Sequence, residues 1–326
     1  MLSPTISIIM PVKNAAQYLE QCMDSIVHQS YGNWELIAVD DGSTDNSMEI
    51  LENYERYNPR IKVLESTEGG IIPALQMAFE HSSGEFITRM DADDVMPTRK
   101  LEQLFDAIEG EPKKTVVTGK VRYFSDKKVS EGYKRYESWL NTVVEDESFR
   151  ENLYRECVIA SPNWMVHRSC FEDDFAISSL EYPEDYDMVF KWFDHGYEFK
   201  SVNSVTHLWR EHPERTSRNS ENYQQKAFFE LKTKRFIQHF NDQIQGVQVI
   251  GAGEKGKLVS EILSRNNVSF QWYDLSPKRE DIQSVMALNK QLTILSNWPA
   301  DERIQEDITK FLRKMNLKFG QELWLF

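Results

Sequence analysis

The sequence predicts an α/β protein with two domains, the first built on a largely parallel sheet and the second a smaller α/β unit. Three observations predict this class. Short apolar strands alternate with helical segments of about 10–15 residues over residues 6–89, a pattern typical of parallel sheets. Polar residues cluster after three of these strands, at the edge where such sheets bind ligands. The alternation breaks at residues 241–243 and restarts at Val247, where the charge balance also changes.

The first domain, residues 1–242, opens with a buried strand at 6–10 that Pro11 closes. A helix is expected over 16–29, because its apolar residues recur on one side. The elements expected next are a strand at 35–39, a helix at 44–57, a strand at 61–64, a helix at 72–82 and a strand at 85–89. From about 116 to 207 the alternation gives way to shorter strands and aromatic-rich segments, and one amphipathic helix over 221–240 closes the domain.

The second domain, residues 246–326, carries a glycine-rich turn after its first strand. Strands are expected at 247–250, 269–273, 291–295 and 322–325, with a helix at 257–265. Gly251, Gly253, Gly256 and Asp274 have the spacing of a dinucleotide-binding site, in which glycines admit a pyrophosphate and an acid holds the ribose. The domain has only about 80 residues, nearer to half of a two-lobed Rossmann fold, and shows no hydride-transfer residue. Nucleotide binding and a packing, regulatory or homo-oligomer role therefore both stay open.

Charge and composition restrict the ligands. The net charge is −14, yet residues 246–326 contain 11 Lys and Arg against 10 Asp and Glu, so the acidic excess lies in the first domain. Such a domain repels nucleic acid and anionic lipid, and a phosphorylated ligand would need a cation beside it. The three cysteines form no CxxC pair, no run reaches the ~18 apolar residues of a membrane helix, and no signal peptide is visible. We expect a cytoplasmic protein with reduced thiols and no transmembrane segment.

An acidic turn directly after the strand at 85–89 is the strongest chemical signal. Asp91 and Asp93 are one residue apart at a strand end, where a turn lets both carboxylates face one ion, and oxygen ligands suit Mn²⁺ or Mg²⁺. The alternative is an acidic turn that caps the following helix. Asp41, at the end of another strand, can accept hydrogen bonds from a base or ribose, whereas Ser43 or Asp45 can instead cap the next helix.

Three segments in order carry a family resemblance: IIMPVKN at 8–14, VDDGSTD at 39–45 and SGEFITRMDADD at 83–94. Together they resemble the family 2 glycosyltransferases, which have the GT-A fold, and the resemblance continues to about residue 217. It implies an inverting transfer from a nucleotide-sugar donor. By this resemblance, the donor-binding residues are Pro11, Val12, Asn14, Asp41, Ser43, Arg89, Asp91 and Arg210, and the metal ligands are Asp91, Asp93 and His212.

The catalytic base is expected in the acidic pair Glu184–Asp185, and Asp185 matches the family's position. An acceptor hydroxyl is a poor nucleophile, and a carboxylate within hydrogen-bond reach can remove its proton, a contribution of about 10²–10⁴-fold. Without the family, the same run is an acidic helix start that the helix dipole favours. Arg210 and His212 resemble the family's Arg-x-His element, which closes over the donor, so Arg210 can offset the diphosphate charge and His212 can complete the metal shell.

The sequence therefore predicts a GT-A domain with a small C-terminal Rossmann-like domain, acting as a metal-assisted glycosyltransferase. A UDP-sugar donor and a saccharide or glycolipid acceptor follow from the resemblance, with polysaccharide or glycolipid synthesis as the setting. The acceptor could also hold the protein at a membrane surface. The alternatives are a nucleotidyltransferase, an NAD(H)-binding oxidoreductase that uses the C-terminal motif, and a catalytically silent nucleotide-binding module. The residues after the first strand argue against a nucleotidyltransferase, which usually has a basic, Gly-rich loop there.

Overall fold

The chain forms two compact units. The computed structural model describes residues 5–174, 177, 180–241, 244, 246–274, 282–285, 288, 291–298 and 302–326. The first unit comprises Met1–Glu147 and Ile159–Arg215, and the second comprises Ser148–Val158 and Thr216–Phe326. A short excursion of the chain from the first unit therefore belongs to the second.

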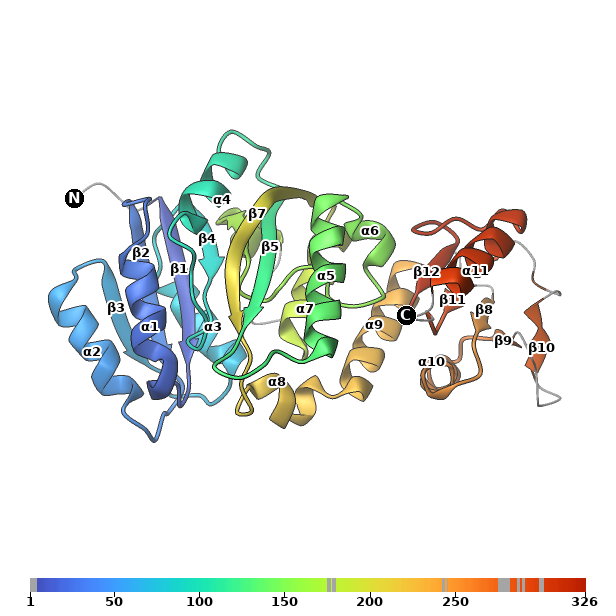
Figure 1. Cartoon of the computed structure of the whole chain (residues 1–326), viewed down its shortest axis with the longest axis horizontal. Helices are drawn as coiled ribbons and strands as arrows, with labels where there is room; N and C mark the ends of the chain where they lie inside the picture. Colours follow the sequence, from blue (N-terminus) through green and yellow to red (C-terminus); the bar gives the residue numbers. More distant parts are fainter. Residues whose placement is uncertain are drawn as a thin grey trace. The chain divides into compact units, whose positions relative to one another are not determined.

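The first unit is built on a seven-stranded sheet with the order β3-β2-β1-β4-β6-β5-β7 (Figure 1). Its strands are β1 (Ile6–Val12), β2 (Trp34–Asp40), β3 (Ile61–Glu65), β4 (Phe86–Arg89), β5 (Thr115–Phe124), β6 (Trp164–His167) and β7 (Glu198–Arg210). All neighbouring pairs are parallel except those of β6, which runs antiparallel to both β4 and β5. The predicted largely parallel sheet is confirmed, and the carboxyl ends of β2, β1 and β4 lie side by side.

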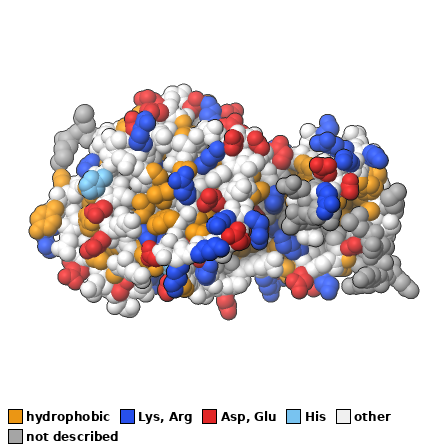
Figure 2. All heavy atoms as spheres, viewed as in Figure 1, with side chains coloured by type: hydrophobic (Ala, Val, Ile, Leu, Met, Phe, Trp, Pro, Cys, Tyr) orange, Lys and Arg blue, Asp and Glu red, His pale blue; other side chains and the backbone are white. Residues whose placement is uncertain are grey.

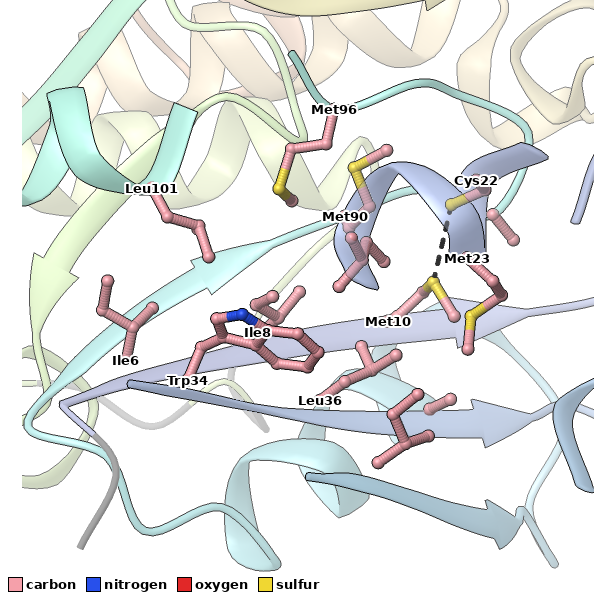
Figure 3. Close-up of a cluster of buried hydrophobic side chains, with 14 of the residues drawn as sticks. Ile6, Ile8, Met10, Cys22, Met23, Trp34, Leu36, Met90, Met96 and Leu101 are labelled. Atoms are coloured by element: carbon pink, nitrogen blue, oxygen red, sulfur yellow. Dashed lines mark hydrogen bonds between the residues drawn. The ribbon is translucent and has the colours of Figure 1, made fainter. Parts of the chain in front are cut away.

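Helices cover both faces of this sheet. They are α1 (Ala16–Val27), α2 (Ser47–Tyr57), α3 (Ile71–Glu80), α4 (Lys100–Ile108), α5 (Glu131–Glu145), the π-helical turn η1 (Cys170–Asp174) and α7 (Glu184–Asp194). Because side chains alternate along a strand, Ile8 and Met10 of β1 point to one face, where they meet Cys22 and Met23 of α1 (Figure 3). Sulfur atoms of Cys22 and Met10 lie 3.9 Å apart in this cluster. The opposite face of β1 and β2 packs against α3.

The second unit holds a five-stranded, all-parallel sheet with the order β10-β9-β8-β11-β12. Its strands are β8 (Val247–Ile250), β9 (Phe270–Asp274), β10 (Ile282–Ser284), β11 (Thr293–Leu295) and β12 (Leu323–Leu325). Its helices are α6 (Phe149–Asn152), α8 (Thr216–Asn219), η3 (Glu221–Tyr223, a 3₁₀ turn), α9 (Gln225–His239), α10 (Glu254–Arg265) and α11 (Glu302–Lys314). Counted along the unit, the strand order is third, second, first, fourth, fifth, as in the first five strands of a dinucleotide-binding sheet.

The region predicted to contain shorter strands holds one, β6, but also two long ones, so that prediction is only partly right. β5 spans 10 residues and β7 spans 13, and they pair in parallel along their length. The register shifts on both sides of Lys120, at an irregularity of the kind that a β-bulge produces. Such a shift changes the phase of the buried and exposed positions, so the sequence pattern of one long strand looks like two short ones.

The boundary between the units also differs from the predicted one at 242–246. Helix α9 belongs to the second unit, where Phe236 lies edge-on to Tyr154 and to Phe326, with ring centroids 5.3 and 5.4 Å apart. Its apolar face is therefore completed by the C-terminal strand. The predicted single helix over 221–240 is two elements, because η3 ends before α9 begins. Residues 242, 243 and 245 of the predicted break lie outside the described residues.

The surface mixes both signs of charge, and acidic and basic side chains are interspersed on the face shown in Figure 2. All three cysteines are buried with free thiols. Within the described part of the chain, no helix combines the length and the apolar character needed to cross a membrane.

Candidate active site

The turns after β1 and β2 are bonded to each other at the carboxyl edge of the sheet. Asn14 has a positive φ of 50°, and its backbone N–H donates to Ser43 Oγ at 2.9 Å. Its side-chain Oδ1 accepts from the Thr44 N–H at 2.8 Å. The bond holds Thr44 in the turn, and α2 begins at Ser47 rather than at the predicted residue 44. Two of the predicted donor residues, Asn14 and Ser43, are thus direct neighbours.

Asp41 lies in the same place and is already bonded through both carboxylate oxygens. Lys13 Nζ lies 3.0 Å from Oδ2, and the Gly70 N–H donates to Oδ1 at 2.8 Å. The Asp41 N–H donates to the Val12 carbonyl at 2.8 Å. Val12 itself is a core residue with 1% of its surface exposed, so its side chain does not line a donor site as predicted. Pro11 is partly buried and pairs with β2.

Arg89 ends β4 and connects two acidic elements. Its Nε donates to Asp91 Oδ1 at 2.8 Å, and one terminal nitrogen donates to Glu184 Oε1 at 3.0 Å. Arg89 is 3% exposed and Glu184 is 2% exposed, so this is a buried bridge between the acidic turn and the start of α7. The geometry does not support the predicted direct contact of Arg89 with the donor. Burial raises the pKa of Asp91, and the Arg89 charge opposes that rise.

Asp93 pairs with the histidine of the predicted Arg-x-His element. His212 Nε2 lies 2.8 Å from Asp93 Oδ2, and the other ring nitrogen lies 3.2 Å from Glu214 Oε2. Burial alone would raise the pKa of Asp93, but the bond to His212 and the charge of Arg215 hold it below its ordinary value. Burial opposes the charged ring, yet Asp93 and Glu214 raise the pKa of His212. The predicted metal ligands Asp93 and His212 are therefore in contact.

Arg210 bonds to the acidic turn through both its backbone and its side chain. Its backbone N–H donates to Asp94 Oδ1 at 2.7 Å, and its Nε donates to the Asp93 carbonyl at 2.6 Å. The guanidinium lies over the rings of Tyr18 and Phe124, 4.8 and 4.4 Å from their centroids. It is 4% exposed. These contacts tie the end of β7 to the turn after β4, and they leave little of Arg210 to meet a diphosphate as predicted.

Asp185 lies in the first turn of α7, which begins at Glu184. The carboxylate is half-buried, and its Oδ1 accepts from the Tyr186 N–H at 2.8 Å. Burial and the neighbouring Glu184 raise the pKa of Asp185 to about 7, against the opposing charge of Arg89. A carboxyl group with this pKa is ionised to a useful extent near neutral pH and is a strong enough base to take a proton.

The donor set at the acidic turn suits a divalent ion shared with a substrate. Among the described residues, no group of three His, Cys, Asp or Glu side chains lies close enough to hold a metal ion. Asp91 is bonded to Arg89, so the two carboxylates of the turn have different partners. Mg²⁺ is usually held by one or two carboxylates plus substrate phosphates and waters, and Asp93 with His212 offers such a partial set. The residues present therefore fit Mn²⁺ or Mg²⁺ bound together with a diphosphate.

The glycine-rich turn of the second unit is bonded to side chains of the neighbouring strand β9. Asp274 Oδ2 accepts from the Ala252 N–H at 2.7 Å, and Trp272 Nε1 donates to the Gly251 carbonyl at 2.8 Å. Gly251 has φ of 110°, and a Cβ on Gly256 would lie 1.9 Å from the Gly251 carbonyl oxygen. A Cβ on Gly253 would meet no atom within 4 Å. Two of the three glycines are thus required by the turn itself.

Some residues of the site have no role of their own in the prediction, although Glu184 stands in the predicted acidic pair. Glu184, Asp94, His207 and Lys100 are buried around the acidic turn. Asp94 and Glu184 adjoin predicted residues, and that adjacency is the signal that could have identified them. Lys100 and His207 come from α4 and β7, and no local motif marks them. Asp40 also lies here: its Oδ2 accepts from the Ser43 N–H at 2.9 Å, while its buried Oδ1 meets no donor within the described residues.

The sheet, its helices and the acidic strand end define the class of protein as an α/β protein with the GT-A fold. The crystal structure of S. aureus TarS 1-349 in complex with UDP-GlcNAc matches with a TM-score of 0.56 and 16% sequence identity, covering 81% of this chain and 73% of that chain. A second crystal structure of S. aureus TarS 1-349 matches with a TM-score of 0.54 and 17% sequence identity, covering 80% of this chain and 71% of that chain. At this identity the likeness shows the fold alone, and the predicted GT-A fold is confirmed.

The family follows from the sequence comparison. The model for "Glycosyl transferase family 2" matches residues 7–175, just over half of the chain. The chain belongs to glycosyl transferase family 2, so the predicted resemblance is confirmed.

Among similar proteins, glycosyltransferase GlyG of Streptococcus pneumoniae serotype 4 is 32% identical over 171 residues, which are 52% of this chain and 54% of GlyG. Chondroitin synthase of Pasteurella multocida is 27% identical over 228 residues, 69% of this chain and 22% of the synthase. The chain thus spans about half the length of the first relative and less than a quarter of the second.

Proposed function

We propose that the protein transfers a glycosyl group from a nucleoside diphosphate sugar, with UDP as the nucleotide, to a hydroxyl of a saccharide or glycolipid, with inversion. The observation that carries the proposal is the Arg89 bridge. Arg89 bonds to both Asp91 and Glu184, so the helix that bears Asp185 begins one side chain away from the acidic turn. A general base beside a diphosphate site is the arrangement that a single in-line displacement requires.

In this mechanism Asp185 takes the proton of the acceptor hydroxyl as the new bond forms. Its half-buried position and its pKa of about 7 support that role, because the carboxylate is both present and basic near neutral pH. Asp93 and His212 would hold Mn²⁺ or Mg²⁺ at the other end of the displacement. Such an ion, when bound, supplies positive charge against the diphosphate as it leaves. Arg210 holds the turn that presents Asp93.

The test is calorimetric titration of UDP into the wild-type protein and into Asp93→Ala, with Mn²⁺ and then with EDTA. We expect binding by the wild type that requires the metal, and loss of that binding in Asp93→Ala. Asp106→Ala is the matched control, because Asp106 is an exposed carboxylate on α4. Binding that is equal in Mn²⁺ and EDTA would exclude the metal. If UDP does not bind, GDP and dTDP are tried next, and failure of all three would exclude the proposed donor site.

A further inference from the structure

Three buried titratable side chains lie in a row behind the acidic turn. Lys100, from the start of α4, places Nζ 3.4 Å from Nδ1 of His207 in β7. The other ring nitrogen of His207, Nε2, lies 2.9 Å from Asp94 Oδ2. Lys100 and His207 are 0% exposed and Asp94 is 1% exposed. The mechanism proposed above uses none of the three directly.

The order of the row fixes the proton on the histidine. While Lys100 is protonated it can only donate, so His207 Nδ1 then accepts from it. The remaining proton of a neutral ring is then on Nε2, which donates to Asp94. Burial lowers the pKa of His207 well below its ordinary value, which agrees with a neutral ring carrying one proton. Lys100 therefore selects the tautomer that can bond to Asp94.

Asp94 links His207 to the residues of the donor site. Its second oxygen accepts from the Arg210 N–H at 2.7 Å, and Arg210 in turn donates to the Asp93 carbonyl at 2.6 Å. Val95 and Leu208 exchange two backbone hydrogen bonds of 3.1 Å each. The acidic turn and the end of β7 are thus joined at successive positions. His212, two residues beyond Arg210, reaches Asp93 from that same joined segment.

Lys100 is costly to the folded state. Its ammonium donates to the Pro162 carbonyl and to His207, and no carboxylate of a described residue lies within ion-pair distance of it. Burial lowers the pKa of Lys100 to about 7. A buried cation without an ion pair loses its hydration and gains little favourable electrostatic energy in exchange. An apolar side chain of the same length would fill the space with a smaller desolvation cost. Stability alone does not explain a lysine at this position.

We propose that Lys100, His207 and Asp94 form a positioning chain for the donor site. They fix the tautomer of His207, the orientation of Asp94 and, through Arg210, the placement of Asp93. Asp93 and His212, which are already in contact, would then be held in place to bind a divalent ion with the diphosphate. The inference rests on the proposed function, because it assigns the three residues to the donor site named there. Residues that orient the ligands of a metal commonly change metal affinity or activity by about 10–100-fold when they are replaced.

The test compares two substitutions at one position. In His207→Gln the side-chain amide keeps an N–H that can donate to Asp94, whereas His207→Leu has about the right volume and no donor. We measure the Kd of UDP with Mn²⁺ and with EDTA by calorimetry, and the melting temperature of each variant. His207→Leu is expected to weaken Mn²⁺-dependent binding of UDP by about 10–100-fold, and His207→Gln is expected to bind within a few-fold of the wild type. Lys100→Met, which also removes the selection of the tautomer, is expected to weaken binding in the same direction.

The outcomes separate this inference from the proposed function. If the wild type binds UDP with Mn²⁺ and folded His207→Leu and Lys100→Met bind equally well, the positioning chain is wrong and the donor site stands. If His207→Gln loses as much affinity as His207→Leu, the bond to Asp94 is not what matters, and the inference is again wrong. If His207→Leu does not fold, Lys100→Met decides. If the wild type binds no nucleoside diphosphate, the proposed function fails and the inference fails with it.

Discussion

The acidic turn after β4 and the glycine-rich turn after β8 occupy equivalent places, each at the carboxyl end of a parallel strand. In the acidic turn, three carboxylates in four residues depend on cations and donors from elsewhere in the first unit, among them Arg89 and His212. In the glycine-rich turn, the Asp274 carboxylate bonds to the backbone of the turn itself. One strand end gathers charged side chains, and at the other the backbone of the turn bonds to side chains from the neighbouring strands.

The different partners of the polar groups at the ends of β4 and β8 indicate which strand end is suited to bind a ligand. The buried bridge from Arg89 to Glu184 and the buried Lys100, which has no carboxylate of a described residue within ion-pair distance, are both costly to desolvate, and such costs are typical of functional sites. At the other strand end, the carbonyl oxygens of Ile250 and Gly251 accept from Ser296 Oγ and from Trp272 Nε1. The spacing of residues is equally suggestive in both turns, so the partners of each polar atom carry the distinction.

The largest contrast is expected between Asp185→Asn and Asp274→Asn. Each change replaces a carboxylate with an amide of the same shape. Asp185→Asn removes the proposed base, and we expect glycosyl transfer to fall by about 10²–10⁴-fold, with UDP affinity unchanged. Asp274→Asn alters the second unit and is expected to leave transfer unchanged. The measurement is the initial rate of UDP release in the presence of donor and acceptor. A loss of less than tenfold in Asp185→Asn would assign the base elsewhere.

Arg89→Met tests how much the buried bridge beside the acidic turn contributes to the free energy of unfolding. The change leaves Glu184 and Asp91 without their guanidinium partner, and loss of one partner of a buried ion pair costs about 3–5 kcal/mol. Arg99→Met is the control, because Arg99 and Glu102 form an exposed pair, and such pairs contribute little to the free energy of unfolding. Urea unfolding of the two variants and the wild type gives both values. Equal effects of the two substitutions would mean that the buried bridge contributes no more than a surface pair.

Gly256→Ala and Gly253→Ala test whether the glycine-rich turn is structural. A Cβ at Gly256 would collide with the Gly251 carbonyl oxygen, so we expect a loss of about 1–3 kcal/mol, as for other overpacked positions. Gly253 has open space and a negative φ of −75°, so its alanine variant is expected to fold as well as the wild type. Thermal unfolding followed by circular dichroism measures both. Weaker binding of NAD(H) or UDP to well-folded Gly253→Ala would instead indicate a ligand at this turn.

The sequence was sufficient for the parts of the fold and site that depend on neighbouring residues. The buried strands β1, β2 and β4 follow from runs of apolar residues, and the acidic turn follows from its place after β4. Helix α11 is absent from the predicted elements, although Ile308, Phe311, Leu312 and Met315 recur at helical spacing. The same apolar periodicity that identified the other helices would have predicted α11.

The parts of the site that the sequence did not predict depend on contacts between residues that are far apart in the chain. Lys100 and His207 are 107 residues apart, and Arg89 and Glu184 are 95 apart. Each of these residues on its own is a common type in an ordinary helix or strand. Arg89 and Arg210 were predicted to meet the donor because they adjoin the motifs, yet burial directs both toward protein partners. Proximity in sequence identifies the neighbourhood of a site, but the direction of each side chain is set by the packing of α4, α7 and β7.

The smallest effect is expected from pH, and it applies to Asp185. Its pKa is raised from an ordinary value of 3.8 to about 7, so kcat/KM for transfer should rise with pH up to about 7 and be about tenfold lower at pH 6 than at its plateau. The sign for stability is opposite. The folded state binds this proton more tightly than the unfolded chain, so ionising Asp185 between about pH 4 and pH 7 lowers the free energy of unfolding. Asp185→Asn removes that proton, and the melting temperature of the variant should fall less than that of the wild type across this range. Parallel curves for the two proteins would mean that Asp185 titrates near its ordinary value, and the base would then lack the environment that the buried bridge gives it.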